Sequence, residues 1–186
     1  LFGVWSTARY SITNREWKVL VDMPGGSPVG SKQGAVSAYS NGSHAAVDAK
    51  RQTVMFHGGS PWHAASTNKP ADLAMNELIA FDAKTETYQR IAGKGKVDGR
   101  SEAGFAFVDH LDRYALRTEK GLFLFDPEKQ EWARAVIEPL PVKSEKDYGW
   151  NYMVYDKQRQ LLILCLHHTW AALRLDAATL KLETGN

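Results

Sequence analysis

The chain has 186 residues, of which 44% are hydrophobic and 24% charged, and its formal net charge at pH 7 is +2. This length and composition are typical of one folded domain, 1–186, with a hydrophobic core. Its 23 basic residues are scattered among 21 acidic ones rather than gathered in the basic patch of a nucleic-acid binder. No apolar run approaches the ~20 residues of a membrane-spanning helix. We therefore expect no nucleic-acid partner and no membrane span.

Cys165 is the only cysteine, so the chain cannot form an internal disulfide. It lies in the apolar run 161–166, which indicates a buried small side chain. The sequence opens at Leu1 in a strand-like segment with no leader, and we expect natural residues to precede it. The sequence does not assign a cellular compartment, although a secreted or periplasmic location is slightly favoured.

Short apolar runs separated by turn residues predict strands along most of the chain. Clear examples are the runs 53–56, 114–116, 121–125 and 161–166. No window holds the i, i+3, i+4, i+7 apolar spacing of a helix over a helical length. The sequence therefore predicts an all-β protein.

Two sequence patterns recur in alternation along the chain. In the first, an apolar run meets an Asp that opens a polar turn; the Asp residues are Asp48, Asp109 and Asp156. In the second, an Asp is followed six positions later by a large apolar residue; the pairs are Asp82 with Tyr88, Asp126 with Trp132, and Asp176 with Leu182. An Asp in this place accepts hydrogen bonds from the backbone N–H groups just ahead, so we interpret these carboxylates as structural rather than catalytic.

Together the two patterns divide the chain into units of four antiparallel strands, at about 34–92, 101–137 and 148–184. An incomplete first unit lies at 1–20. Repeated four-stranded units of this size indicate the blades of a β-propeller. A β-sandwich is the competing architecture, but its strands would not be expected to carry the same turns at matching places three times. We expect a propeller segment of about four blades, the first of them incomplete.

One unit resembles a kelch repeat. Its segment 54–59, Val-Met-Phe-His-Gly-Gly, is followed by the strand 76–82 and then by Tyr88. The Gly pair has a physical role, because glycine lets the chain leave a buried strand at positive φ. The other two units have 116–118 and 166–168 in place of the Gly pair, so the motif itself is confined to one unit.

The resemblance extends to kelch-like propellers in general, including galactose-oxidase-like domains. Residues 78–85 also resemble the Asp-x-x-Thr turn of quinoprotein propellers, although the Gly usual after that Thr is absent and Tyr88 stands where Trp is usual. Propellers of these kinds usually have more blades than the three full units counted here. The resemblance implies a segment of a larger propeller, or one chain of an assembly, that acts as a protein-interaction or scaffolding module.

The alternative function is a fragment of a propeller enzyme: a galactose-oxidase-like or quinoprotein-like oxidoreductase, or a glycan-active enzyme. Resemblance to galactose oxidase would imply copper and a Cys–Tyr crosslink, but Cys165 lies within an apparent core strand. The histidines show no His-x-His or His-x-x-x-His spacing, and no Gly-x-Ser-x-Gly nucleophile motif occurs. We expect no metal or cofactor, name no catalytic residue, and favour a role without catalysis.

The candidate binding residues gather in two places. His57, Trp62 and His63 lie in or beside the long insertion 60–76, and long loops between short strands often carry recognition. Trp150 and Tyr152 begin the first strand of the last unit, which in a propeller lies near the channel mouth, where aromatic rings can stack on a peptide or a sugar.

His168 and Trp170, farther along the same unit, complete the candidate set. The expected partner is a protein or the remaining blades of the propeller, with a glycan as another candidate. Packing between blades would explain the same aromatic residues without a ligand.

Overall fold

The computed structural model describes residues 6–22, 44–57, 76–99, 104–118, 120–137, 152–166 and 169–184. Over these residues the protein is all-β, as predicted, with one short 3₁₀ turn at Asp109–Leu111. The strands are β1 Ser6–Ser11, β2 Glu16–Asp22, β3 His44–Asp48, β4 Thr53–His57, β5 Glu77–Asp82, β6 Thr87–Ala92, β7 Gly104–Val108, β8 Arg113–Thr118, β9 Gly121–Asp126, β10 Glu131–Val136, β11 Tyr152–Asp156, β12 Leu161–Leu166, β13 Thr169–Arg174 and β14 Lys181–Glu183.

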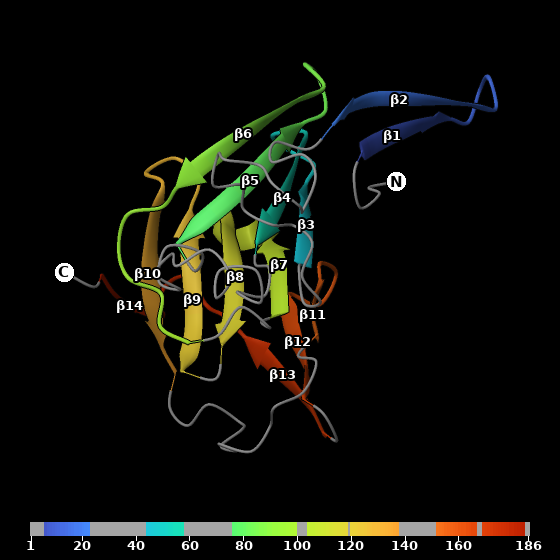
Figure 1. Cartoon of the computed structure of the whole chain (residues 1–186). Coiled ribbons are helices and arrows are strands. Elements are labelled where there is room, and N and C mark those ends of the chain that lie inside the picture. Colours follow the sequence, from blue (N-terminus) through green and yellow to red (C-terminus); the bar gives the residue numbers. More distant parts are fainter. Residues whose placement is uncertain are drawn as a thin grey trace.

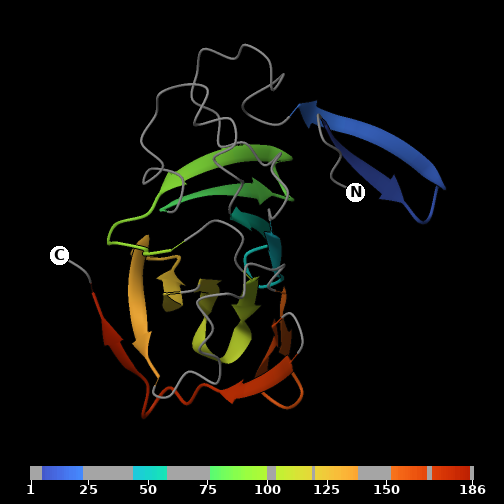
Figure 2. The same ribbon diagram turned by 60° about the horizontal axis from the view of Figure 1, so that its bottom comes forward.

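These strands form four antiparallel sheets (Figure 1). The first is the hairpin β1–β2, which extends away from the others, and the second is the meander β3–β4–β5–β6. The third contains β7–β8–β9–β10 with β14 added at its outer edge, and the fourth contains β11–β12–β13. In Figure 2 the last three sheets follow one another around the molecule in sequence order.

The pairing of β14 corrects the prediction for the last unit, which assigned this strand to the edge of β13. Instead, Val136 of β10 pairs with Lys181 of β14. The reason lies in the connection: β13 ends at Arg174, and Leu175 then buries its side chain against the β7–β10 sheet. The chain therefore crosses this sheet and reaches its far edge (Figure 2). Within the described residues, the outer edge of β13 has no neighbouring strand.

Six hairpins share one loop geometry. Each loop has four residues, and the last of them adopts a left-handed backbone with φ between 53° and 57°; these residues are Arg15, Gln52, Glu86, Asp112, Gln130 and Gln160. Non-glycine residues seldom adopt this conformation, so its repetition shows that one type of hairpin loop recurs throughout this molecule.

The turn carboxylates of both sequence patterns accept backbone N–H groups just ahead of them, as predicted. Asp48 and Asp156 each accept the backbone N–H three residues ahead, at 3.0 Å. Asp82 accepts the N–H of Lys84 at 2.7 Å, and Asp126 accepts that of Glu128 at 2.9 Å. Asp109 is the exception, because the strand register places Val108 rather than Asp109 level with Asp48 and Asp156.

With this one-residue correction, the three large sheets have the same register. Gly104 of β7 corresponds to His44 of β3 and to Tyr152 of β11, and the remaining positions follow in step. The first strand of the central sheet, β7, contacts the first strands of both neighbouring sheets, β3 and β11. Each sheet therefore meets the next through equivalent strands.

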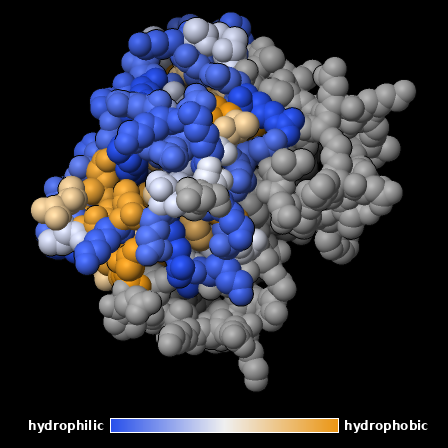
Figure 3. Space-filling view, turned by 90° about the vertical axis from the view of Figure 1, so that its left-hand side faces the viewer, coloured by the Kyte–Doolittle hydropathy of each residue, from blue (hydrophilic) through white to orange (hydrophobic). Residues whose placement is uncertain are grey.

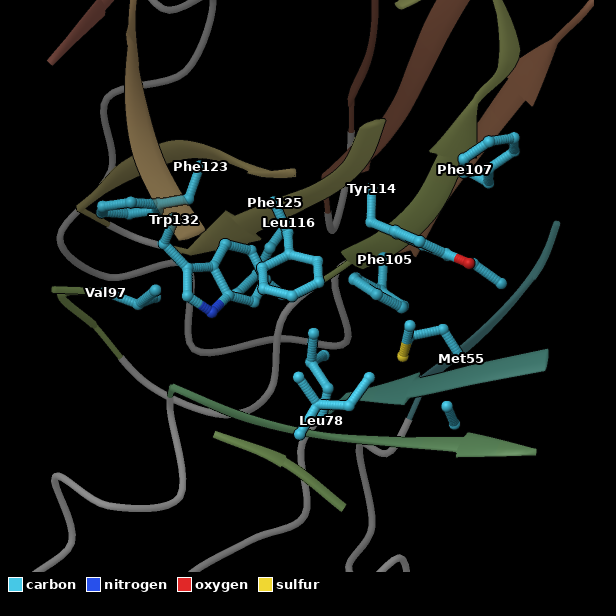
Figure 4. Packing of buried hydrophobic residues seen from close by; sticks show 13 residues of the cluster. Met55, Leu78, Val97, Phe105, Phe107, Tyr114, Leu116, Phe123, Phe125 and Trp132 are labelled. Atoms are coloured by element: carbon cyan, nitrogen blue, oxygen red, sulfur yellow. The ribbon is translucent and has the colours of Figure 1, made fainter. Parts of the chain in front are cut away.

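Two hydrophobic clusters fill the spaces on either side of the central sheet. The aromatic cluster lies between the β3–β6 and β7–β10 sheets and contains Met55, Leu78, Phe105, Phe107, Tyr114, Phe125 and Trp132 among others (Figure 4). The aliphatic cluster lies between the β7–β10 and β11–β13 sheets and contains Ala106, Val108, Ala115, Leu122, Leu124, Met153, Leu162 and Leu164 among others. Alternation along β7, β8 and β9 sends successive side chains to the two clusters in turn.

The connection from β6 to β7 is held against Trp132. The indole N–H donates to the carbonyl of Asn76 at 3.4 Å, and the backbone N–H of Trp132 donates to that of Lys94 at 2.9 Å. A Cβ at Gly93 would lie 2.5 Å from the indole nitrogen, which explains why glycine stands there. The indole of Trp132 thus holds the residue before β5, and its backbone holds the β6–β7 connection, against the β7–β10 sheet.

Candidate interaction site

The structure describes three of the seven residues predicted to bind a partner. Trp62, His63, Trp150 and His168 lie outside the described residues. His57, Tyr152 and Trp170 are described, and they occupy two different settings: His57 is completely buried, whereas Tyr152 and Trp170 are exposed.

His57 ends β4 inside the aromatic cluster. Its ring centroid lies 5.6 Å from that of Phe105 and 5.9 Å from that of Trp132. A side chain that is 0% exposed cannot contact a partner from solution. The structure therefore gives His57 a packing role between two sheets in place of the predicted recognition role.

Tyr152 and Trp170 belong to one exposed surface of the β11–β13 sheet, which we call the terminal apolar face. Its apolar members are Tyr152, Val154, Leu161, Ile163, Trp170 and Ala172, and the register places Asp156 and Arg174 on the same side, level with Leu161. The strand register places these residues on one side of the sheet, because Val154 pairs with Ile163 and Ile163 with Ala172. Tyr152 is 53% exposed, Val154 59% and Trp170 73%. Two of the residues predicted to bind a partner therefore lie on this surface.

The opposite side of the same sheet is buried. Met153, Leu162 and Leu164 pack into the aliphatic cluster against the β7–β10 sheet. Cys165 lies within β12, level with Tyr152 on one side and Trp170 on the other. The β11–β13 sheet therefore carries apolar side chains on both sides, and among the described residues only one of these sides is covered by another sheet.

The three first strands meet at one end, where His44 and Tyr152 come together across β7. Their rings are 6.1 Å apart in an edge-to-face arrangement, and burial lowers the pKa of His44 below its ordinary value. Gly104 lies beside them, and a Cβ there would be only 2.6 Å from the Cβ of Met153. Glycine thus allows β7 and β11 to approach closely, and a neutral imidazole borders the exposed Tyr152 at neutral pH.

At the other end of the first strands, an ionic network joins the hairpin turns of the first two large sheets. Arg51 contacts Asp48 of its own turn at 2.8 Å and Asp112 of the next sheet at 2.5 Å, and Lys50 contacts Asp112 at 2.7 Å. Hydrogen bonding from Arg51 holds the pKa of Asp112 well below its usual range. Tyr114 completes the network by donating to Asp48 at 3.4 Å.

A second link joins the next pair of sheets. His110 Nε2 lies 2.6 Å from the carbonyl of Leu175, and Nδ1 lies 2.6 Å from the hydroxyl of Tyr155. A carbonyl can only accept, so Nε2 donates, and in the neutral ring Nδ1 accepts from Tyr155. Lys157 adds a contact of 2.7 Å to Asp109, which raises the pKa of this lysine. Each turn of the series is therefore connected to its neighbour.

A shallow hollow of about 390 Å³ lies on the β7–β10 sheet and is lined by Asp98, Gly99, Lys120, Phe123 and Arg134. Charges of both signs border it, and Arg134 donates to the carbonyl of Lys120 at 3.4 Å. No local sequence pattern predicts this hollow, because its lining comes from three separate segments of residues 98–134. Its described lining brings together no paired carboxylates and no nucleophile beside a base.

The side of the molecule formed by β6, β10 and β14 is mainly hydrophilic, with apolar areas between the hydrophilic side chains (Figure 3). Val136 of β10 and Leu182 of β14 are exposed on these strands. Over the parts of the chain that the structure describes, no three potential metal ligands stand close enough to share an ion, and no helix could cross a membrane. Among the described residues, aromatic side chains are exposed in two places: Tyr152 and Trp170 on the β11–β13 sheet, and Tyr10 with Trp17 on the β1–β2 hairpin.

Sequence reasoning missed the turn network, although a signal for it was present. An Arg stands three residues after the turn Asp in Asp48–Arg51 and again in Asp156–Arg159, and both pairs form contacts of 2.8 Å. The second partner of Arg51, Asp112, comes from a different unit and could not be read from local spacing.

Comparison with known proteins gives no family for the chain. No family description matches it, and no curated protein matches it. Among solved structures, it is similar to the extracellular domain of a hybrid two-component system from B. thetaiotaomicron, with 10% sequence identity and a TM-score of 0.42. That similarity covers 75% of this chain and 16% of the other.

Proposed function

We propose that this chain is a kelch-like β-propeller segment that serves as a protein-interaction or scaffolding module, as part of a larger propeller or assembly. One observation carries the proposal: three consecutive sheets share one strand register, and each presents equivalent positions to the next. Sheets stacked in this way through their first strands suit the blades of a propeller.

The exposed surface supports an interaction role more than a catalytic one. Tyr152 and Trp170 are the kind of large side chains that dominate protein interfaces, and both are exposed beside Val154. Contiguous exposed apolar surface on a folded protein commonly marks an interaction site.

Light scattering of the purified chain over a range of concentrations tests the proposal. We expect the chain either to associate or to bind a dye that reports exposed apolar surface. A stable monomer of 20.7 kDa that binds no such dye would contradict the proposal. Metal analysis and an absorbance spectrum provide an independent check, because bound copper, or calcium with a quinone chromophore, would favour a propeller enzyme instead.

A further inference from the structure

Most positions of the terminal apolar face are buried in the other two large sheets. Trp170 corresponds to Leu78 of β5 and Leu122 of β9, which are both 0% exposed. Val154 likewise corresponds to Ala46 and Ala106, and both are buried. The register is the same, so the difference in exposure comes from what lies next to each sheet.

In both earlier cases the covering element is the following sheet. Ala46 and Leu78 belong to the aromatic cluster, where the β7–β10 sheet covers them. Ala106 and Leu122 belong to the aliphatic cluster, where the β11–β13 sheet covers them. The terminal apolar face continues this series of interfaces, and among the described residues no sheet follows it.

An arginine at the end of this face repeats the ionic part of the pattern. Arg51 and Arg159 hold the same place in their turns, and each contacts its own turn Asp at 2.8 Å. The side chain of Arg51 is 24% exposed because it also contacts Asp112 of the following sheet, whereas that of Arg159 is 69% exposed. Among the described residues, Asp156 is the only acid that Arg159 contacts.

We propose that the terminal apolar face binds an antiparallel β-sheet of a partner protein. The partner sheet places an apolar side against Tyr152, Val154 and Trp170, and an acidic side chain of a hairpin turn beside Arg159. This inference rests on the proposed interaction role and adds to it the surface and the chemistry of the partner.

Charge argues against the β3–β6 sheet of a second copy of this chain as the partner. Its β3–β6 sheet would bring Gln52 to the place of the acid, since Gln52 corresponds to Asp112 in the shared loop. The neighbouring residues Lys50 and Arg51 would add positive charge near Arg159. Like charges at an interface disfavour association, so the partner requires a turn of the opposite charge.

The experiment appends a sheet of the required chemistry to the whole chain. Residues 104–137 are repeated after residue 186 through a long Gly/Ser linker. This copy carries the Phe105 and Phe107 side of the central sheet together with Asp112. The tryptophans are labelled with fluorine, and the resonance of Trp170 is assigned from a Trp170→Phe variant.

We expect the Trp170 resonance to lose its accessibility to a soluble paramagnetic quencher in the fusion, approaching that of the buried Trp132. An Asp112→Asn change, and separately a Phe107→Ser change, both made only in the appended copy, should restore accessibility in part. These controls leave the host chain unaltered.

Two results would overturn the proposal. The first is a fusion in which Trp170 remains as accessible as in the original chain, since the same segment docks on the β3–β6 sheet within the chain itself. The second is a dimer of the unmodified chain that Trp170→Glu abolishes, which would assign the face to a second copy. The second result would leave the proposed interaction role intact, whereas a dye-free monomer would remove that role.

Discussion

The two sides of the central sheet β7–β10 are built differently, although the same strands supply both. The side toward β3–β6 carries large rings: Phe105, Phe107, Tyr114, Phe123, Phe125 and Trp132. The side toward β11–β13 carries mostly small and aliphatic side chains: Ala106, Val108, Ala115, Leu122, Leu124 and Ala135. One register can therefore be stabilised by filling space with rings or by close approach of small residues, and the two sides should fail under opposite kinds of substitution.

Trp132→Ala should have the largest effect, because it empties the middle of the ring-filled side. Trp132 is 0% exposed and contacts both Phe125, at 5.0 Å between ring centroids, and His57. Truncation of a buried Trp costs about 3–5 kcal/mol of unfolding free energy. Urea denaturation followed by circular dichroism measures the loss.

The exposed Trp17 of the hairpin provides the matched control, since Trp17→Ala should change the unfolding free energy by no more than about 1 kcal/mol. Similar losses in the two variants would show that Trp132 is not packed as described.

Ala115→Leu should act on the other side by overfilling it. Ala115 is 0% exposed and faces the β11–β13 sheet within the aliphatic cluster, where added methyl groups have no room. Overpacking of this kind costs about 1–3 kcal/mol. Thermal and urea denaturation both report it.

Ala172→Leu makes the same change on the exposed terminal apolar face. We expect this control to alter stability by no more than about 0.5 kcal/mol. A cost as large as that of Ala115→Leu would mean that the terminal face is already covered.

Most strands and hairpin turns of this fold could be predicted from the sequence, and the exceptions have physical reasons. Alternating apolar residues in runs such as 121–125 predict strands, and the recurring turn Asp residues predict where hairpins form, because both signals are local. For the pattern ending at Asp109, the predicted end of the strand was wrong by one residue, because a 3₁₀ turn places this Asp in the loop. The pairing of β14 with β10 was also beyond local reasoning, because burial of Leu175 directs the chain.

In the candidate site, too, local sequence patterns predict some features, and contacts between distant residues decide the others. Exposure of Tyr152 and Trp170 agrees with a surface role that aromatic residues near strand ends suggest. Burial of His57 depends on Phe105 and Trp132, which are distant in sequence, so no local pattern could reveal it. The contact of Arg51 with Asp112 likewise joins residues 61 positions apart.

The pH dependence of stability should distinguish the ionic network on the ring-filled side. Because Arg51 lowers the pKa of Asp112 in the folded protein, the contact stabilises the fold above the unfolded-state pKa of about 3.9. This stabilisation is lost progressively as the pH falls from about 4 toward the lowered pKa of folded Asp112, because the carboxyl of the unfolded chain takes up its proton first. Asp112→Asn should cost about 1 kcal/mol at pH 7, and its difference from the original protein should shrink in acid.

Urea denaturation of both proteins at pH 7, 5 and 3 measures this trend. Asp98→Asn serves as the control, because Asp98 is half exposed and contacts only Lys96 among the described charged groups. A cost of Asp112→Asn that is constant from pH 7 to pH 3 would show that the carboxylate charge is not what matters.

Tyr155→Phe should have the smallest effect, because it removes one hydrogen bond from the aliphatic side and keeps the ring. The Tyr155 ring stacks on His110 at 5.7 Å, and Phe can retain that contact. Loss of the hydroxyl leaves His110 Nδ1 without its 2.6 Å partner, at a cost of about 0.5–1.5 kcal/mol. Tyr152→Phe is the matched control: it removes the same hydroxyl from an exposed residue of the same strand and should leave the unfolding free energy unchanged. If both variants were neutral in urea denaturation, the aliphatic side would be held by packing of small residues alone, and the contrast between the two sides of the central sheet would be greater than the present contacts indicate.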